Sequence, residues 1–224
     1  MSNDEKVYQK LLRAIVEHKL EPGVRLPEDK LSEAFGISRT GIRKVLQRLA
    51  IEHFVVIEPN KGAQVNEPSR KEAIDVLESR ILIEPLLITD ILKHWDDTQS
   101  CYFRSLVSQE HKAEHRGDLA ASIQLTARFH FELARLSKNA VLAELIEQLC
   151  LRSSLVIAAF GSKSSVNCEC GSHSEIIDLL DAGELVEAQA WMAHHLELIK
   201  DSLNLDSKNE QPINFQQLFS EMEQ

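Results

Sequence analysis

The chain has 224 residues, of which 43% are hydrophobic and 27% charged, a composition ordinary for a soluble globular protein. No apolar run approaches the roughly 20 residues that a membrane-spanning helix needs, and the opening stretch MSNDEKVYQK is too polar for a signal peptide. We therefore expect a cytoplasmic protein with no membrane partner. Four cysteines at uneven spacings are too few for a secreted disulfide framework.

The formal net charge of −10 is unevenly distributed along the chain. Residues 1–68 contain 11 Lys and Arg against 10 Asp and Glu, whereas residues 69–224 contain 14 against 25. A near-neutral first part joined to an acidic second part predicts two domains with different partners. Only the first part is suited to binding a polyanion such as nucleic acid.

Residues 1–68 predict a winged helix-turn-helix. Apolar residues at helical spacing indicate a helix over 5–19, which the stretch EPG ends. A second helix opens at Pro27 and ends at Gly36, and a third follows Ser38, a good N-cap residue. A short connection containing glycine is typical of a helix-turn-helix. The stretch HFVVIEPNKGAQVN then reads as two strands around a tight turn, which supplies the wing.

The third helix is basic, because no acidic residue falls between Ala34 and Ile51. Its buried side is predicted to consist of the apolar residues Ile42, Val45, Leu46 and Leu49. The outward side, near the helix N-terminus, then carries Arg39, Thr40, Arg43 and Lys44, with Asn60, Lys61 and Gly62 at the tip of the wing. The N-terminal end of a recognition helix is the part that enters the major groove of DNA. We also expect Gly41 to permit close approach to DNA. The alternative for the outward side as a whole is a basic helix face that is only solvated.

The stretch LEPGVRLPEDKLSEAFGISRTGIRKVLQRLA, followed by PNKGAQV, resembles the DNA-binding domain of GntR-type bacterial transcription regulators. The resemblance covers roughly residues 7–65. It implies that Ser38, Arg39, Thr40 and Arg43 contact the operator and that Asn60, Lys61 and Gly62 form the minor-groove wing. Gly41-Ile42 departs from the Pro-Val pair of many members, which affects the expected base preference.

Residues 69–204 show helical periodicity and no strand pattern, so we expect an all-α bundle. The overall fold is thus predicted to be mainly α, with a DNA-binding domain over 1–68, a bundle over 69–204 and a C-terminal tail over 205–224. Predicted helices span 69–95, 97–116, 118–137, 139–161, 172–182 and 184–203. The tail carries a short amphipathic stretch that we expect to pack on its own bundle or on a partner subunit.

Arg80 and Glu84 lie four residues apart on or beside the apolar stripe of the first bundle helix. Buried ionisable groups are costly unless they are paired. Two interpretations stay open: a structural ion pair, or an Arg80 that faces a cavity receiving an anion.

Three histidines point inward from three predicted helices: His130, His173 and His195, whereas His194 lies off its helix's inward stripe. One buried histidine is usually a hydrogen-bonded core residue. Three that converge would instead suit a divalent transition metal such as zinc or nickel, because neutral imidazole is a good ligand for both. Spacing alone leaves both interpretations open.

The stretches FHFELARLSKNAVL and HSEIIDLLDAGELVEAQAWMAHHLELI resemble the FCD effector-binding domain of the FadR branch of GntR regulators. In its metal-binding members an Asp or Asn, four residues before the first of three histidines, helps to hold the ion beside a small-acid pocket. The resemblance implies that His130, His173 and His195 are the ligands and that Arg80 lines the pocket. Thr126 occupies the position of that Asp or Asn, and a threonine hydroxyl is a poor metal ligand. A three-histidine site completed by water or by the effector is therefore expected.

Cys168, Cys170 and His173 form a competing ligand set within six residues. A C-x-C pair without a second pair is a weak zinc signal, and redox sensing or two reduced loop cysteines are the alternatives.

The expected function is a metabolite-responsive transcription regulator, most often a repressor, that binds a palindromic operator as a homodimer. A small carboxylate in the metal-containing pocket would control it. The alternatives are a DNA-binding regulator with a vestigial, metal-free pocket and, less favoured, a three-histidine metal-dependent enzyme, for which no general base is evident.

Overall fold

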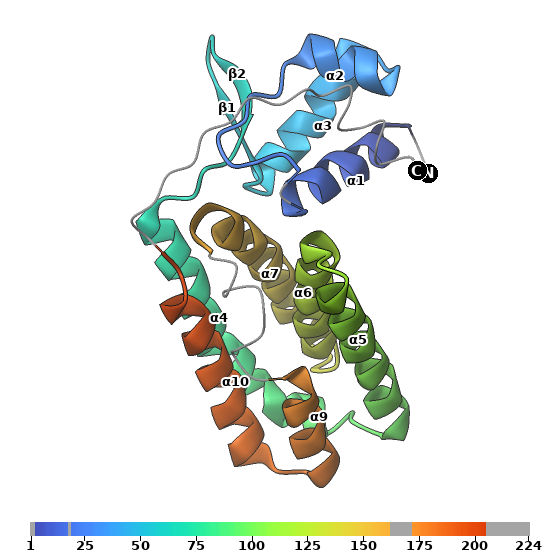
Figure 1. Ribbon diagram of the computed structural model, residues 1–224, viewed down its shortest axis with the longest axis vertical. Coiled ribbons are helices and arrows are strands. Elements are labelled where there is room, and N and C mark those ends of the chain that lie inside the picture. Colours follow the sequence, from blue (N-terminus) through green and yellow to red (C-terminus); the bar gives the residue numbers. More distant parts are fainter. Residues whose placement is uncertain (1–2, 18, 162–171, 205–224) are drawn as a thin grey trace. The chain divides into compact units, whose positions relative to one another are not determined.

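A computed structural model describes residues 3–17, 19–161 and 172–204, which belong to two compact units that divide between Pro68 and Ser69 (Figure 1). The first unit is a winged helix-turn-helix and the second a helical bundle, so the predicted mainly α fold is confirmed. Cys168, Cys170 and the tail over 205–224 lie outside the described residues. None of the helices in the described ranges combines the length and apolar character that crossing a lipid bilayer demands.

The first unit contains three helices and one hairpin: α1 (Asn3–Val16), α2 (Glu28–Phe35), α3 (Arg39–Ile51), β1 (Val55–Glu58) and β2 (Gly62–Val65). The first helix ends at Val16, three residues before the predicted end, where the amides of Lys19 and Leu20 both donate to the Ala14 carbonyl. Gly36 ends α2 in the left-handed conformation at φ 63°, a backbone state that glycine adopts without strain. The core of this unit is built from α1, α2 and α3, through Leu11, Ile15, Leu31, Leu46 and Leu49.

The antiparallel hairpin pairs Val55 with Val65 and Glu58 with Gly62. Its three-residue connection is Pro59-Asn60-Lys61, and Asn60 and Gly62 have φ values of 64° and 84°. Asparagine and glycine are the residues that tolerate this left-handed region in a tight turn. The turn therefore presents Asn60, Lys61 and Gly62 to solvent, as the wing prediction requires.

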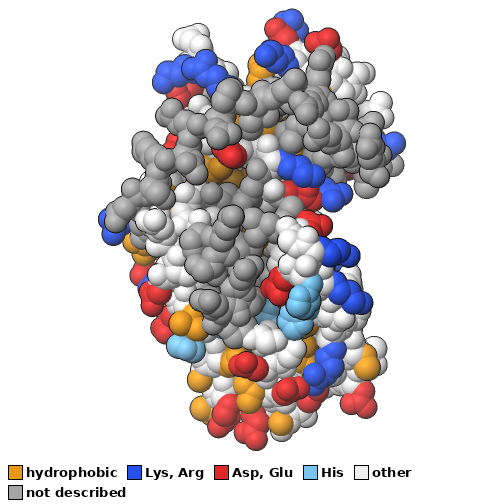
Figure 2. Space-filling model, in the orientation of Figure 1, with side chains coloured by type: hydrophobic (Ala, Val, Ile, Leu, Met, Phe, Trp, Pro, Cys, Tyr) orange, Lys and Arg blue, Asp and Glu red, His pale blue; other side chains and the backbone are white. Residues whose placement is uncertain are grey.

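The second unit contains six described helices: α4 (Arg70–Leu92), α5 (Asp97–His115), α6 (Leu119–Arg135), α7 (Ala140–Phe160), α9 (His173–Ala182) and α10 (Leu185–Asp201). They pack in a closed ring in the order α4, α7, α6, α5, α9 and α10, with α10 again against α4. Side-chain caps begin several of them; the Ser69 hydroxyl, for example, accepts from the Glu72 amide at 3.1 Å. On the face shown in Figure 2, acidic side chains gather around the turn between α9 and α10.

Candidate metal and nucleic-acid binding sites

The ring of helices brings the three predicted histidines together. His130 lies on α6, His173 is the first residue of α9 and His195 lies on α10, and each is at most 2% exposed. One potential ligand atom from each ring lies within 4.8 Å of the others. The ring centroids are 4.9 to 5.4 Å apart. Helical periodicity alone predicted the inward orientation, and the packing of α9 between α5 and α10 creates the convergence.

Buried carboxylates contact two of these rings, in each case at the Nδ1 atom. Glu84 on α4 lies 2.7 Å from Nδ1 of His130, and Glu110 on α5 lies 2.8 Å from Nδ1 of His173. A carboxylate accepts a hydrogen bond from Nδ1–H, which leaves the lone pair on Nε2. The Nε2 atoms of His130 and His173 are buried and have no hydrogen-bond partner among the described residues. Carboxylate, then imidazole, then an open Nε2 is the arrangement by which proteins orient metal-binding histidines.

The charge states of His130 and Glu84 favour metal ligation by His130 at neutral pH. Burial, with the Arg80 charge nearby, lowers the pKa of His130 to about 4, although Glu84 acts in the opposite direction. Burial alone would raise the pKa of Glu84, but Arg80 and His130 together outweigh burial and lower that pKa to about 2. His130 is therefore a neutral imidazole beside an ionised carboxylate, which is the form a divalent ion requires.

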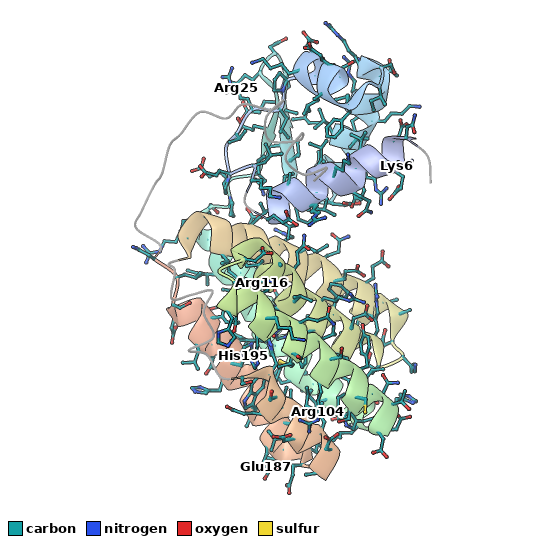
Figure 3. The ribbon with its side chains drawn as sticks, turned by 45° about the vertical axis from the view of Figure 1, so that its right-hand side comes forward. Lys6, Arg25, Arg104, Arg116, Glu187 and His195 are labelled. Atoms are coloured by element: carbon teal, nitrogen blue, oxygen red, sulfur yellow. The ribbon has the colours of Figure 1, made fainter. Side chains whose placement is uncertain are left out.

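The third ring, His195, is held by packing. It stacks on the indole of Trp191, one turn earlier on α10, with centroids 4.7 Å apart and planes 11° apart. The Trp191 indole is fixed in turn by a 2.8 Å hydrogen bond from Nε1 to Glu175 on α9. His195 is labelled in Figure 3, where it lies on the inner side of α10. The neighbouring His194 is exposed, so the two histidines have opposite orientations, as the sequence pattern predicts.

Arg80 forms the buried ion pair that was one of the two interpretations of the sequence. Its Nε donates to Glu84 at 2.6 Å, which makes a buried ion pair, and its Nη1 donates to the Ser153 hydroxyl at 3.2 Å. Its Nη2 is buried and has no hydrogen-bond partner in the described part of the chain. One donor of a fixed guanidinium therefore stays available, and an anion is the natural acceptor for it.

Thr126 lies one turn before His130 on α6. Its hydroxyl donates a short hydrogen bond to Glu110, the carboxylate that holds His173. Burial alone would raise the pKa of Glu110, but His173 and the Thr126 hydroxyl keep that pKa below its ordinary value. Thr126 therefore supports one of the imidazoles indirectly through Glu110.

Sequence reasoning did not identify Glu110 at all. The signal was available, because Glu110 continues the buried stripe of α5, which contains Phe103, Leu106, Val107 and Ala113. An acidic residue at an inward position of a bundle helix requires a buried partner. Glu84 was considered only as the partner of Arg80, and its bond to His130 was missed.

On the winged unit, the outward face of α3 carries the predicted DNA-contacting residues. Ser38 caps the helix by accepting from the Gly41 amide at 3.2 Å. The side chains of Arg39, Thr40, Arg43 and Lys44 are exposed, and Ile42, Val45, Leu46 and Leu49 are buried. The periodicity therefore predicted both faces of the helix.

Acidic residues outside α3 pair with three of its arginines. These pairs were not predicted from the sequence, because only the acids within this helix were considered. Arg39 lies 2.9 Å from Asp29, and Arg43 makes a two-point contact with Glu28. Arg48 contacts Glu5 and Glu52 and stacks on Tyr8, with its Cζ 3.6 Å from the ring centroid. Arg48 thus ties α3 to α1 and contributes to the fold of this unit.

The expectation for Gly41 was wrong. Gly41 lies on the buried side of α3, where an added Cβ would be 3.2 Å from both Asp4 Oδ1 and Ile37 Cδ1. The close approach that glycine permits is therefore between α3 and the rest of its own unit. The helical period places Gly41 on the same inward face as Ile42, away from the outward face that carries Arg43.

Comparison with known proteins agrees with these two units. Residues 3–65 match the family model of bacterial regulatory proteins of the gntR family, and residues 75–198 match that of the FCD domain. The chain is 25% identical over 143 residues to a Bacillus subtilis (strain 168) protein described as the uncharacterized HTH-type transcriptional regulator YdhC, covering 63% of this chain and 64% of that protein. A fatty acid metabolism regulator protein of Shewanella pealeana is 32% identical over 133 residues, covering 55% of this chain and 56% of that protein. The chain therefore spans just over half to about two thirds of these relatives' length.

Solved structures share the fold over most of the chain. The structure of E. coli McbR/YncC superimposes with a TM-score of 0.75 at 19% identity, covering 88% of this chain and 95% of that one. A putative transcriptional regulator GntR from Rhodococcus sp. RHA1 gives 0.76 at 22% identity, covering 90% and 97%. The matched proteins are described as regulators, and none of those named here is described as an enzyme. Since the FCD model alone spans more than half of the chain and the gntR model covers the winged unit, this chain belongs to the GntR family of bacterial transcription regulators, in the FadR branch that carries an FCD domain.

Proposed function

We propose that the protein binds operator DNA as a homodimer and that a small organic acid in the bundle controls this binding. The winged unit, residues 1–68, would read DNA, and residues 69–204 would bind the effector and dimerise. Two winged units on one dimer would read the two halves of a palindrome, because the symmetry of protein and operator usually match. Repression is the proposed outcome, because blocking an operator requires only that the protein bind there and that the effector release it.

The DNA-binding proposal rests on the exposed cationic face at the N-terminal end of α3. Arg39, Arg43 and Lys44 project from one side of a capped helix, and the wing tip carries Lys61. The described part of the second unit has no comparable role, because the chain beyond residue 68 is strongly acidic and repels a polyanion.

Selection from a pool of randomised duplexes tests this proposal. The full-length protein should enrich an inverted repeat, and light scattering should give the mass of a dimer. A reporter gene behind the enriched sequence should be expressed less when the protein is present. Enrichment of single, unrepeated sites by a monomer would contradict the palindrome and the dimer; increased reporter expression would contradict repression.

We also propose that His130, His173 and His195 hold a zinc or nickel ion. The observation that carries this proposal is the pair of buried, unpartnered Nε2 atoms on His130 and His173, each on a ring fixed through Nδ1. A vestigial, metal-free pocket would leave these polar atoms buried at a cost of about 1–3 kcal/mol each. Three protein ligands leave a tetrahedral ion one position for water or for an effector oxygen.

A carboxylate is the effector class that the remaining donors favour. The unpartnered Nη2 of Arg80 is buried, already oriented by Glu84, and able to donate to an anionic oxygen. Because the Shewanella relatives are named fatty acid metabolism regulators, the panel of candidate effectors should include fatty acids as well as short mono- and dicarboxylates.

Metal analysis and thermal shift assays test the site. Protein purified without chelator should contain about one transition-metal ion per chain, and one class of carboxylate should raise its unfolding temperature. That effector should change operator affinity by about 5- to 150-fold, the usual range for coupled sites. A metal-free protein that no carboxylate stabilises would support the vestigial pocket instead.

A further inference from the structure

The guanidinium of Arg43 is held by one of its two edges. Nε donates to Oε1 of Glu28 at 2.9 Å and Nη2 donates to Oε2 at 2.6 Å, so both carboxylate oxygens are used. The contact joins the first residue of α2 to the outward face of α3, two helices that pack side by side (Figure 1). By contrast, Arg39 meets Asp29 through one of its nitrogens, at 2.9 Å.

This geometry leaves the other edge of the guanidinium available. Arginine has five N–H donors in a rigid plane, and the two-point contact with Glu28 uses one on Nε and one on Nη2. The remaining edge presents parallel N–H groups from Nη1 and Nη2. Such a pair matches O6 and N7 of guanine in the major groove, the commonest specific contact between a protein and DNA. The Arg43 side chain is 59% exposed, so this edge is accessible.

Stability alone does not explain the pair. The Arg43 side chain is 59% exposed and that of Glu28 31%, so water screens the pair and both long side chains lose freedom, which limits its contribution to folding. The same restriction of freedom helps recognition, since a side chain that is already oriented loses less entropy on binding. Glu28 is also suited to its own position, where the helix dipole of α2 favours a negative charge in the first turn.

We propose that Glu28 is a specificity-determining positioning residue, which fixes the guanidinium of Arg43 so that its free edge reads one guanine in each half of the operator. The inference rests on the proposed DNA-binding function. It assigns to an acid of α2 a role that the basic residues of α3 cannot perform alone. The carboxylate itself lies near phosphates and adds repulsion, so its benefit is selectivity rather than affinity.

The test compares four single variants and one double variant of the full-length protein in selections from a randomised duplex pool. Affinity measurements on single-base variants of the enriched sequence follow. Arg43→Ala identifies the position that Arg43 reads. Glu28→Ala and Glu28→Gln remove the two-point contact, since a glutamine amide offers only one acceptor. Glu33→Gln is the matched control, because it removes the same charge from an exposed residue of α2 that lies outside the two-point contact.

The wild-type protein should prefer guanine at that position by about 5- to 150-fold, the discrimination given by a good two-point contact. Both Glu28 variants should lose most of this preference at the same position, while their affinity for unrelated duplexes stays equal or rises. Glu33→Gln should keep the preference. Combining Glu28→Ala with Arg43→Ala should cause no further loss, as expected for two residues that act as a unit.

Full guanine preference in Glu28→Ala would overturn the inference, as would an increased preference, which would identify Glu28 as a competitor of DNA. Loss of preference at a different base from that affected by Arg43→Ala would also overturn it. Failure of the wild-type protein to bind any duplex is a separate outcome that rejects the proposed function, and this inference with it.

Discussion

At the scale of single residues, the proposed metal site depends on which nitrogen of each histidine is engaged. Glu84 and Glu110 contact Nδ1 of His130 and His173, and the Nε2 atoms of these two rings are buried without a hydrogen-bond partner in the described part of the chain. Three ligands that come from α6, α9 and α10 can meet only if each ring is held in one orientation. The supporting carboxylates and the Trp191 stack are therefore expected to strengthen the proposed site by fixing the ligands.

Replacing His195 by Ala should reduce the bound metal to well below one ion per chain, because it removes one of three buried ligands. Replacing His194 by Ala should leave the metal content unchanged, because that side chain is exposed on the same helix. Elemental analysis of both purified variants measures this. The reverse result would mean that the inward face of α10 has been assigned to the wrong histidine.

Glu110→Ala should weaken metal affinity by about 10- to 100-fold, the usual effect of losing a carboxylate that orients a ligand. Glu110→Gln should lie between this variant and the wild type, since its amide oxygen still accepts from His173. Competition with a coloured chelator measures the affinity, and circular dichroism checks the helix content. Glu144→Ala, an exposed position on α7, is the control; equal affinities in all four proteins would remove Glu110 from the site.

At the scale of helices and strands, periodicity and capping residues predicted most of the fold. Ser38 and Ser69 mark true helix starts, and the turn around Asn60 and Gly62 marks the hairpin. These signals are local, which is why the sequence alone carries them. The contacts that were missed join residues far apart in the chain, namely Glu28 with Arg43 and Glu110 with His173, and they depend on how helices pack.

The inward face of α3 shows the same limit on a smaller scale. Its apolar residues were assigned correctly, but Gly41 has no side chain that contributes to a hydrophobic pattern. Its place on the buried face follows from the helical period, and the limited space there for a side chain follows from the nearby Asp4 and Ile37. Only the packed structure reveals how little space there is.

Asp181 is one of the residues that attach the short helix α9 to α5. The carboxylate accepts from Trp95 Nε1 at 2.8 Å, from the Ser100 hydroxyl at 2.9 Å and from Arg104 Nη2 at 2.7 Å. Arg104, labelled in Figure 3, lies on α5. Asp181→Ala should destabilise the bundle by about 1–2 kcal/mol, the net value of a few partly exposed hydrogen bonds, and lower its melting temperature by about 3–8 °C.

The effect should depend on pH in a defined direction. Burial is the largest single effect and opposes ionisation, but the three hydrogen-bond donors together outweigh it and lower the pKa of Asp181 in the folded protein. The stabilisation is therefore complete above the unfolded pKa of about 3.9 and disappears as the pH falls through the lower folded value. Thermal unfolding of wild type and variant should differ most at pH 7, and the difference should shrink as the pH falls below the unfolded pKa of about 3.9; a constant difference would contradict this role.

At the scale of the whole molecule, the proposed metal links three helices of the bundle and so couples effector binding to the packing of the second unit. Anything that binds only the folded state stabilises it, by about 2.7 kcal/mol at a free concentration 100 times the dissociation constant. Removing the metal with a chelator should therefore lower the melting temperature of the wild-type bundle. His195→Ala should melt at the same temperature with and without chelator, and an equal chelator effect on both proteins would place the ion elsewhere.

The exposed cations of α3 are proposed to dock on duplex DNA. The most direct test is the salt dependence of binding of the full-length protein to a duplex enriched from the random pool. The logarithm of affinity should fall steeply with the logarithm of salt concentration, and substituting Arg39, Arg43 and Lys44 by Ala should reduce the slope by about one for each phosphate that is no longer neutralised. Substituting the exposed cations Lys71, Lys93 and Lys112 of the bundle should leave the slope unchanged. An unchanged slope in the α3 variant, or binding insensitive to salt, would contradict the account.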